Sequence, residues 1–153
     1  MNPSGPVDRT ILLVEDNPDD ADLTVRAFAR HSPATRVVVA QDGPQALDYL
    51  RRTGRWADRQ PPDMPAVVVL DLKMPRVDGL ELLRMIRGYG PTRYVPVVVV
   101  TSSSDPRDVL DSYGHGANSY VRKSVDYAEF AASLRAIGEY WVERNVGVID
   151  PDA

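Results

Sequence analysis

Cysteine is absent from the 153 residues, and only two histidines occur. Without cysteine there are no disulfide bonds, thiolate metal sites or cysteine nucleophiles. Positive charge is not in excess, since 22 acidic residues outnumber 18 Lys and Arg, and the net charge of −4 argues against a general nucleic-acid-binding protein. The longest apolar runs, Val67–Leu70 and Val95–Val100, are far shorter than the about 20 residues that span a bilayer. The first residues lack the pattern of a signal peptide. We therefore expect a soluble, cytoplasmic protein that binds neither nucleic acid nor membrane.

Short apolar runs alternate with segments of helical periodicity along the chain. Runs rich in β-branched residues predict five strands, at Thr10–Val14, Arg36–Ala40, Ala66–Leu70, Val95–Val100 and Asn118–Val121. Helical spacing and capping residues predict five helices, at about 17–31, 43–52, 79–88, 105–114 and 125–145. The two central runs are apolar throughout, which is typical of strands covered on both faces. The alternation predicts an α/β fold in which five helices flank a five-stranded parallel sheet.

One domain accounts for the whole pattern. Residues 9–145 contain every predicted strand and helix, so we assign residues 1–8 to an N-terminal extension and 146–153 to a C-terminal tail. The polar, proline-rich connection at 53–65 is too short and too central to link two domains. No output domain follows the last helix, so we expect the protein to act through contacts with other proteins.

Polar residues follow four of the five predicted strands. Glu15 and Asp16 come after the first strand, Asp71 after the third, Thr101 after the fourth, and Lys123 two residues after the fifth. The functional crevice of an open α/β sheet lies beyond the carboxyl ends of its strands, so these side chains are expected to meet there. Acids are also common at helix starts and in turns, so the prediction depends on all five residues together.

The chemistry of these five residues indicates phosphoryl transfer. Three carboxylates in one crevice repel one another unless a cation or protons intervene. Oxygen ligands without His or Cys favour a hard divalent cation such as Mg²⁺, for which Mn²⁺ can substitute. Lys123 and Thr101 add an ammonium and a hydroxyl group that can hold phosphoryl oxygens beside the carboxylate of Asp71. We therefore expect Asp71 to accept a phosphoryl group.

Five motifs at these strand ends resemble those of one family. They are ILLVED at 11–16, VVLDLKMP at 68–75, Asp78-Gly79, VVVTS at 98–102 and GANSYVRK at 116–123. In this order they are similar to the receiver domain of response regulators, over about residues 8–145. The connection at 53–65, the Lys123-Ser124 pair and the aromatic residues at 139–141 resemble receivers associated with phytochrome-type sensor histidine kinases. The resemblance implies a flavodoxin-like receiver fold with strand order 2-1-3-4-5.

The resemblance also implies a role for each site residue. Asp71 would be the phosphoacceptor and a Mg²⁺ ligand. Asp16 would be a further direct Mg²⁺ ligand, Glu15 would bind the ion through water, and Lys73 would bind it through its backbone carbonyl. Thr101 and Lys123 would bind the phosphoryl group, and Tyr120 would be a switch that moves with Thr101. The phosphoryl donor would be a sensor histidine kinase, such as a bacteriophytochrome. The protein would then act either as a phosphorylation-switched adaptor or as a phosphate carrier in a multistep phosphorelay.

One position departs from the family pattern. The family usually has proline after the conserved lysine, whereas Ser124 follows Lys123 here. A cis bond before a non-proline residue costs about 2.5–4 kcal/mol, so the loop is expected either to be trans or to retain strain. Lys73 is a second cation close to Asp71, and it is expected to affect hydrolysis of the phosphoryl group.

The final helix suggests a homodimer. Phe130, Leu134, Ile137 and Trp141 form its core stripe, while Tyr127, Ala131 and Tyr140 lie outside that stripe. Additional apolar surface usually marks an interface. The resemblance places this interface on the fourth helix, fifth strand and fifth helix.

Other functions are disfavoured. An Asp-nucleophile phosphatase of the haloacid-dehalogenase type needs a second acid two residues after the nucleophile, where this chain has Lys73, and carries its nucleophile on the first strand. The EDNPDD segment would repel the phosphate of a flavin, and no P-loop motif is present. We therefore do not expect an enzyme beyond the protein's own phosphotransfer and dephosphorylation. His31 and His115 are interpreted as a helix end and a turn residue, and Arg51, Arg52 and Arg55 as a solvated face.

Overall fold

The computed structural model describes residues 9–31, 34–59, 64–74 and 77–148. The predicted extension at 1–8 and most of the predicted tail lie outside these ranges. Five parallel strands form one sheet in the order β2-β1-β3-β4-β5, as the resemblance implied. The strands are β1 (Thr10–Val14), β2 (Arg36–Ala40), β3 (Val67–Leu70), β4 (Val97–Thr101) and β5 (Ser119–Arg122).

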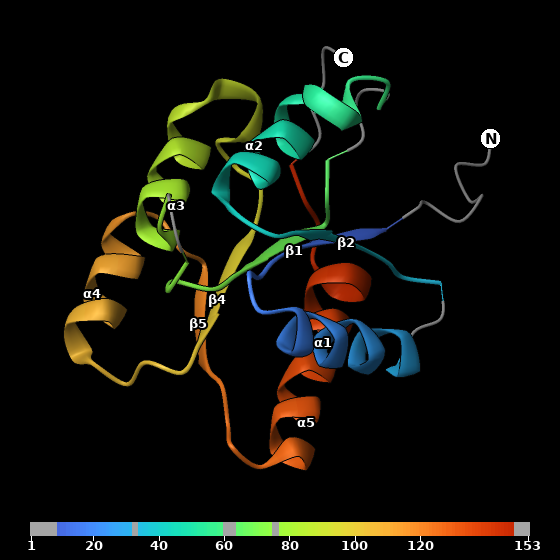
Figure 1. Cartoon of the computed structure of the whole chain (residues 1–153), viewed down its shortest axis with the longest axis vertical. Coiled ribbons are helices and arrows are strands. Elements are labelled where there is room, and N and C mark those ends of the chain that lie inside the picture. The colour runs from blue at the N-terminus through green and yellow to red at the C-terminus, as the bar shows by residue number, and fades with distance from the viewer. Residues whose placement is uncertain (1–8, 32–33, 60–63, 75–76, 149–153) are drawn as a thin grey trace.

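The helices form a layer on each face of the sheet. They are α1 (Pro18–His31), α2 (Gly43–Arg51), α3 (Gly79–Gly88), α4 (Pro106–Gly114) and α5 (Tyr127–Gly138), with three short helices η1 (Gly54–Trp56), η2 (Gly90–Thr92) and η3 (Glu139–Arg144). Helices α1 and α5 lie side by side on one face, and α2 and α3 cover the other face, with α4 beside β5 (Figure 1). Within the described ranges, no helix is long and apolar enough to cross a membrane.

Two apolar layers separate the sheet from its helices. On the α2–α3 side, Leu82, Leu83 and Ile86 of α3 are fully buried against the sheet. On the α1–α5 side, Phe28 and Leu134 occupy the corresponding layer. All four residues of β3 are buried, as expected for an apolar central strand.

An Asx residue begins each of the five longer helices. The side chain of Asn17 accepts hydrogen bonds from the backbone N–H groups of Asp19 and Asp20, at 2.9 and 3.0 Å. Equivalent caps are formed by Asp42, Asp78, Asp105 and Asp126. Because every helix in a parallel sheet begins at the carboxyl ends of the strands, these caps place polar and acidic side chains at one edge of the sheet.

Arg87 ties the end of α3 to the start of two strands. Its guanidinium donates to the carbonyls of Gly116 and Val95, at 3.0 and 2.7 Å, and to the Asn118 side chain at 2.9 Å. The same Asn118 oxygen accepts the N–H of Val97, at 2.8 Å. The edge of the sheet away from the helix starts is therefore held by side-chain as well as backbone hydrogen bonds.

The structure corrects three sequence predictions. Strand β4 begins at Val97, two residues later than predicted, because Pro96 has no N–H to donate and contributes only its carbonyl, which accepts from Val68. The predicted fifth helix begins at Tyr127, and its α-helical part ends at Gly138, with the last turns of the predicted helix widened into the π-helix η3. The short helices η1 and η2 were not predicted, since three residues carry no periodicity.

Candidate functional site

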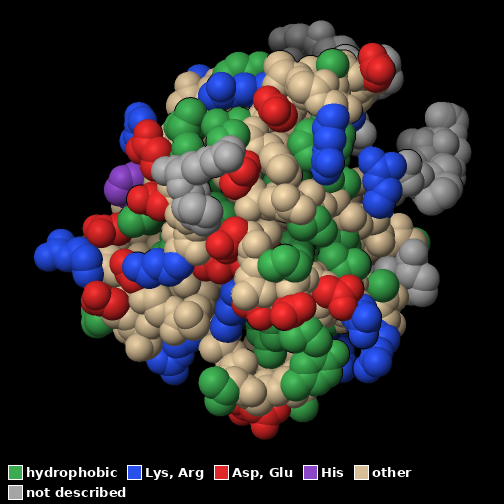
Figure 2. All heavy atoms as spheres, in the orientation of Figure 1, with side chains coloured by type: hydrophobic (Ala, Val, Ile, Leu, Met, Phe, Trp, Pro, Cys, Tyr) green, Lys and Arg blue, Asp and Glu red, His purple; other side chains and the backbone are tan. Residues whose placement is uncertain are grey.

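The carboxyl ends of β1 and β3 bring three acidic side chains together. Glu15 and Asp16 follow β1, and Asp71 follows β3, which pairs with β1 in parallel register. One carboxylate oxygen from each residue lies within 4.8 Å of the others. Glu15 is buried, Asp71 is nearly buried and Asp16 is exposed, so the cluster is open on one side. Figure 2 shows acidic side chains gathered near the middle of this face.

The ammonium group of Lys123 lies among these acids. Its Nζ is 2.7 Å from Oε1 of Glu15 and 3.2 Å from Oδ2 of Asp71. A third carboxylate, that of Asp20 on α1, lies at 3.4 Å. Asp20 was not predicted as a site residue, because acids are common in the first turn of a helix and no sequence spacing relates Asp20 to Lys123.

Burial and charge set the protonation of this cluster. Burial raises the pKa of Glu15 to about 7, although the hydrogen bond from Lys123 opposes the rise. Burial alone would lower the pKa of Lys123, but the hydrogen bond to Glu15 and the charge of Asp71 together raise it above its ordinary value. Lys123 is therefore a permanent cation, whereas Glu15 holds a proton over part of the neutral range unless a further cation is present.

Backbone groups fix the directions of the acidic side chains. The N–H of Asn17 donates to Oε2 of Glu15, and the N–H of Lys73 donates to Oδ1 of Asp71, both at 3.2 Å. The backbone of Lys123 is placed by its own N–H, which donates to the carbonyl of Thr101 at 2.8 Å. The site residues predicted on three different strands therefore meet in one place.

Gly79 allows the loop after β3 to fold tightly against the site. A Cβ atom at this position would lie 2.6 Å from the backbone oxygen of Asp71 and 2.6 Å from Cα of Leu72. The N–H of Gly79 donates to the carbonyl of Leu72 at 3.0 Å, which closes the loop. Glycine is required here by close backbone approach, because any side chain would push the backbone of Asp71 away.

A chain of polar contacts links the loop after β3 to Tyr120. The Tyr120 hydroxyl donates to the carbonyl of Ser103 at 2.9 Å, and the Ser103 hydroxyl donates to the Asp108 carboxylate. Asp108 also pairs with Nζ of Lys73, at 3.6 Å. Thr101, at the end of β4, is fully buried. Ser103 and Asp108 were not predicted, because Tyr120 on β5 and Lys73 in the loop after β3 are distant from them in the sequence and no spacing indicates these contacts.

Ser124 extends the cap of α5. Its hydroxyl donates to the Glu129 side chain at 2.8 Å and accepts the N–H of Asp126 at 3.1 Å. Asp126 in turn caps α5 by accepting from Ala128. The residue that replaces the usual proline therefore contributes hydrogen bonds that proline could not make.

His115 lies outside the acidic cluster. His115 is exposed in the turn after α4, where its ring nitrogen lies 2.7 Å from the carbonyl of Asp111. His31 ends α1, as predicted, and its side chain lies outside the described part of the structure. Pro75 of the VVLDLKMP motif is also outside it.

Comparisons with known proteins agree with this geometry. A family model described as response regulator receiver domain matches residues 11–135. The chain is 39% identical over 138 residues to the probable methanogenesis regulatory protein FilR2 of Methanothrix harundinacea, which covers 88% of this chain and 84% of that protein. It is 30% identical over 135 residues to response regulator Rcp1 of Synechocystis, covering 88% of this chain and 90% of that protein.

Two solved structures resemble the whole fold. The phosphorylated cyanobacterial phytochrome response regulator RcpA matches with a TM-score of 0.85 and 31% identity, over 94% of this chain and 100% of that one. The Mn²⁺-bound form of Rcp1 matches with a TM-score of 0.82 and 28% identity, over 92% of this chain and 99% of that one. The acidic cluster of Glu15, Asp16 and Asp71 fits such a metal site, with Mg²⁺ as the cofactor and Mn²⁺ as a substitute.

Proposed function

This chain belongs to the response regulator receiver family, and from that premise we propose that it accepts a phosphoryl group on Asp71 from the phosphohistidine of a sensor histidine kinase. One observation carries the assignment of Asp71. Asp71 is the member of the acidic cluster that lies at the carboxyl end of the central strand β3, and its Oδ2 is 3.2 Å from the Lys123 ammonium. Its other oxygen is already oriented by the N–H of Lys73.

The proposed reaction is a displacement at phosphorus. Oδ of Asp71 forms a bond to phosphorus while the P–N bond to the kinase histidine breaks, and the electron pair of that bond remains on the imidazole. Asp16, Asp71, the carbonyl of Lys73 and, through water, Glu15 would hold Mg²⁺, which would supply charge neutralisation at the phosphoryl oxygens. Lys123 and the Thr101 hydroxyl bind those oxygens after transfer.

Phosphorylation is proposed to alter the face beside β5. Engagement of Thr101 by a phosphoryl oxygen would shift the loop after β4, to which Tyr120 is bonded through the carbonyl of Ser103. Tyr120 is half-buried between that loop and solvent, so movement of the loop changes the exposure of its ring. The switch is thus built from two adjacent strands, with Val99 paired to Tyr120.

Phosphorylation of the isolated protein tests the assignment. Incubation with acetyl phosphate and Mg²⁺ should add about 80 Da, the mass of one phosphoryl group, in an intact-mass spectrum. Asp71→Asn should abolish the added mass, since an amide is not a nucleophile for this reaction. Asp20→Asn is the matched control, because it removes a neighbouring carboxylate that also contacts Lys123, and it should retain the added mass. Phosphorylation of Asp71→Asn at the normal rate would contradict the proposal.

The proposed partner is a histidine kinase of the phytochrome type, in the cytoplasm. Its support is the likeness to RcpA, described as a cyanobacterial phytochrome response regulator. Phosphotransfer from such a kinase, compared with other histidine kinases at equal concentration, tests the pairing. Transfer that is no faster than from unrelated kinases would refute it.

The proposed receiver unit spans residues 9–145. Val142 in η3 is buried, and its carbonyl accepts a hydrogen bond from the Arg9 guanidinium. The first and last parts of that range therefore contact each other and pack on the same core.

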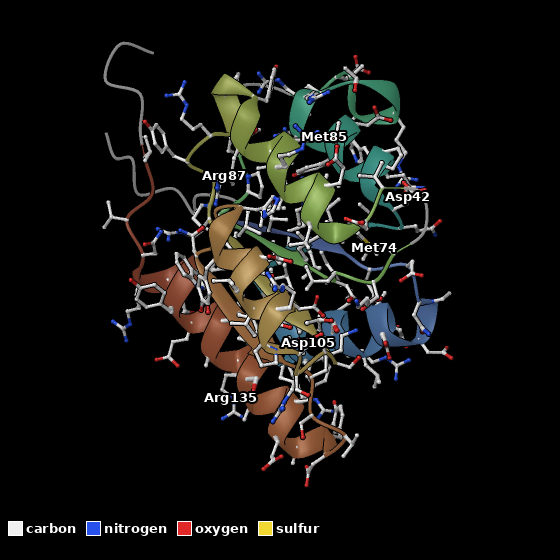
Figure 3. All side chains as sticks on the ribbon, turned by 90° about the vertical axis from the view of Figure 1, so that its left-hand side faces the viewer. Asp42, Met74, Met85, Arg87, Asp105 and Arg135 are labelled. Carbon is white, nitrogen blue, oxygen red and sulfur yellow. The ribbon has the colours of Figure 1, made fainter. Side chains whose placement is uncertain are left out.

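We propose a homodimer through α4, β5 and α5. Exposed apolar side chains lie on this side of the molecule: Leu110, Tyr113, Tyr127 and Tyr140 are 64%, 50%, 46% and 52% exposed. Figure 3 views this side, with α4 in front of α5. In a two-fold symmetric dimer, the same exposed side chains would be buried on both subunits.

A further inference from the structure

Arginine and aromatic side chains gather at the end of the molecule opposite the acidic cluster. We define an arginine–aromatic surface as Arg51, Arg55, Trp56, Tyr89, Arg93 and Tyr94. These residues come from the end of α2, from η1 and from the chain around η2, which lie together at the top of Figure 1. In Figure 3, Arg87 near this end is well separated from Asp42 and Met74 at the carboxyl ends of the strands.

Each arginine of this surface lies over an aromatic ring. The guanidinium carbon is 4.2 Å from the ring centroid for Arg55 over Trp56, 5.0 Å for Arg51 over Tyr89 and 5.6 Å for Arg93 over Tyr94. The contact from Arg51 to Tyr89 joins the end of α2 to the residue after α3. Stacking restricts the guanidinium and leaves its N–H edge free to bind an anion, so less entropy is lost on binding.

Within the described part of the chain, the arginines of this surface have no ion-paired acid. In the described ranges, none of Arg51, Arg55 and Arg93 forms an ion pair, although acids exceed bases in the chain. All three side chains are exposed, and Tyr94 is 64% exposed beside them. As far as the described residues go, the surface is therefore a group of oriented cations without ion-paired acids, in a protein whose net charge is negative.

Helix capping explains only part of this arrangement. Arg51 lies in the last turn of α2, where a cation is favoured by the helix dipole. The carbonyls at the end of α2 are bonded by another residue, Arg59, whose Nη2 is 2.7 Å from the Tyr49 oxygen. Arg55 and Arg93 lie beyond the ends of α2 and α3 and cap neither helix. Their orientation over aromatic rings needs a different explanation.

We propose that the arginine–aromatic surface binds an acidic segment of a partner protein. Carboxylates match the paired N–H donors of guanidinium groups, and the exposed ring of Tyr94 can pack against the aliphatic parts of Asp and Glu side chains. A nucleic acid fits less well, because the acidic edge of the sheet and the net charge of −4 repel an extended polyanion. The surface is distant from Asp71, so this binding is independent of the proposed phosphotransfer.

A labelled peptide tests the proposal on the full chain. The probe is a fluorescein-labelled polyglutamate peptide of about ten residues, with a polyglutamine peptide and a single-stranded oligonucleotide as comparisons, measured by fluorescence anisotropy at about 20 mM salt. We expect the glutamate peptide to bind, to weaken at physiological salt and to lose at least about tenfold in affinity in the Arg51→Gln/Arg55→Gln double variant. The matched control is Arg30→Gln/Arg135→Gln, which removes the same charge from exposed positions elsewhere and should bind normally.

Three results would overturn the proposal: no binding of the glutamate peptide, an equal loss in both double variants, or binding of the oligonucleotide in preference to the peptide. Phosphorylation by acetyl phosphate, measured on the same samples, should be unchanged in both variants. This second readout shows that the variants are folded and separates a failure here from a failure of the proposed function.

Discussion

At the residue scale, the single positive charge of Lys123 does not balance the negative charges of the acidic side chains around it. One ammonium group contacts the carboxylates of Glu15, Asp20 and Asp71, and Asp16 lies beside them. Part of the remaining negative charge is relieved by a proton on Glu15, whose pKa burial raises to about 7. A divalent cation would replace that proton, so metal binding and proton release are coupled at this site.

The affinity for Mg²⁺ should therefore rise with pH between about 6 and 8, because Glu15 loses its proton over this range. Calorimetry at several pH values measures this, with Glu15→Gln expected to flatten the dependence and Asp16→Asn to remove most of the binding. The folding stability of the metal-free protein has the opposite pH dependence. Without metal, the folded state keeps a proton that the unfolded state has lost, so this group's contribution to stability falls as pH rises from about 4.5 to 7. An affinity that is constant with pH in the wild type would contradict this account.

The pairing of Lys73 with Asp108 should limit the rate of phosphorylation. Asp108→Asn removes the anion that draws the exposed Lys73 ammonium toward α4, so more positive charge becomes available near Asp71. We expect acetyl phosphate to react a few-fold faster, and stability to change by less than about 1 kcal/mol, since the Lys73 side chain is 69% exposed and asparagine can still accept the Ser103 hydrogen bond. Asp111→Asn, on the same helix, is the control. A slower reaction in Asp108→Asn alone would reverse the assigned role of Lys73.

At the scale of elements, the helices and strands follow their local sequence closely. Two strands, β1 and β2, have the predicted bounds, because their β-branched runs end at polar residues. Helix starts were also predictable, since Asx caps act within three residues. Contacts between a loop and a distant helix were not predictable from spacing. The contacts of Lys123 with Asp20 in α1 and of Lys73 with Asp108 in α4 depend on how distant parts of the chain pack, and they became visible only in three dimensions.

Helix α5 should contribute to stability mainly through its buried stripe. Leu134→Ala removes a side chain that is 1% exposed between α5 and the sheet, and it should lower the free energy of unfolding by about 2–5 kcal/mol. Leu23→Ala makes the same chemical change on α1 at a position that is 39% exposed, so its cost should be much smaller. Urea denaturation of both variants checks the difference. Equal losses would mean that α5 is not packed as described.

At the scale of the whole molecule, the proposed homodimer can be separated from other surface effects. Tyr140→Glu places a charge on the proposed interface, and by two-fold symmetry it does so twice, so the variant should be monomeric. Tyr94→Glu makes the same change at an exposed tyrosine outside that interface and should leave the dimer intact. Light scattering at high micromolar concentration, with and without a phosphoryl mimic, measures both. A wild type that is monomeric in both states would rule out the dimer.

The distribution of charge along the strands affects the rate of association with a partner rather than the binding affinity. Among the described residues, acids at the helix starts and arginines without an ion pair at the opposite end separate negative from positive charge along the strands. In the field of a charged kinase domain such a molecule experiences a torque, and it rotates before the surfaces touch. A larger fraction of the collisions then occurs in an orientation that permits binding. Dissolved salt would weaken this alignment, so ionic strength would set how often a productive encounter occurs, while the proposed reaction at Asp71 would proceed at its own rate once contact is made.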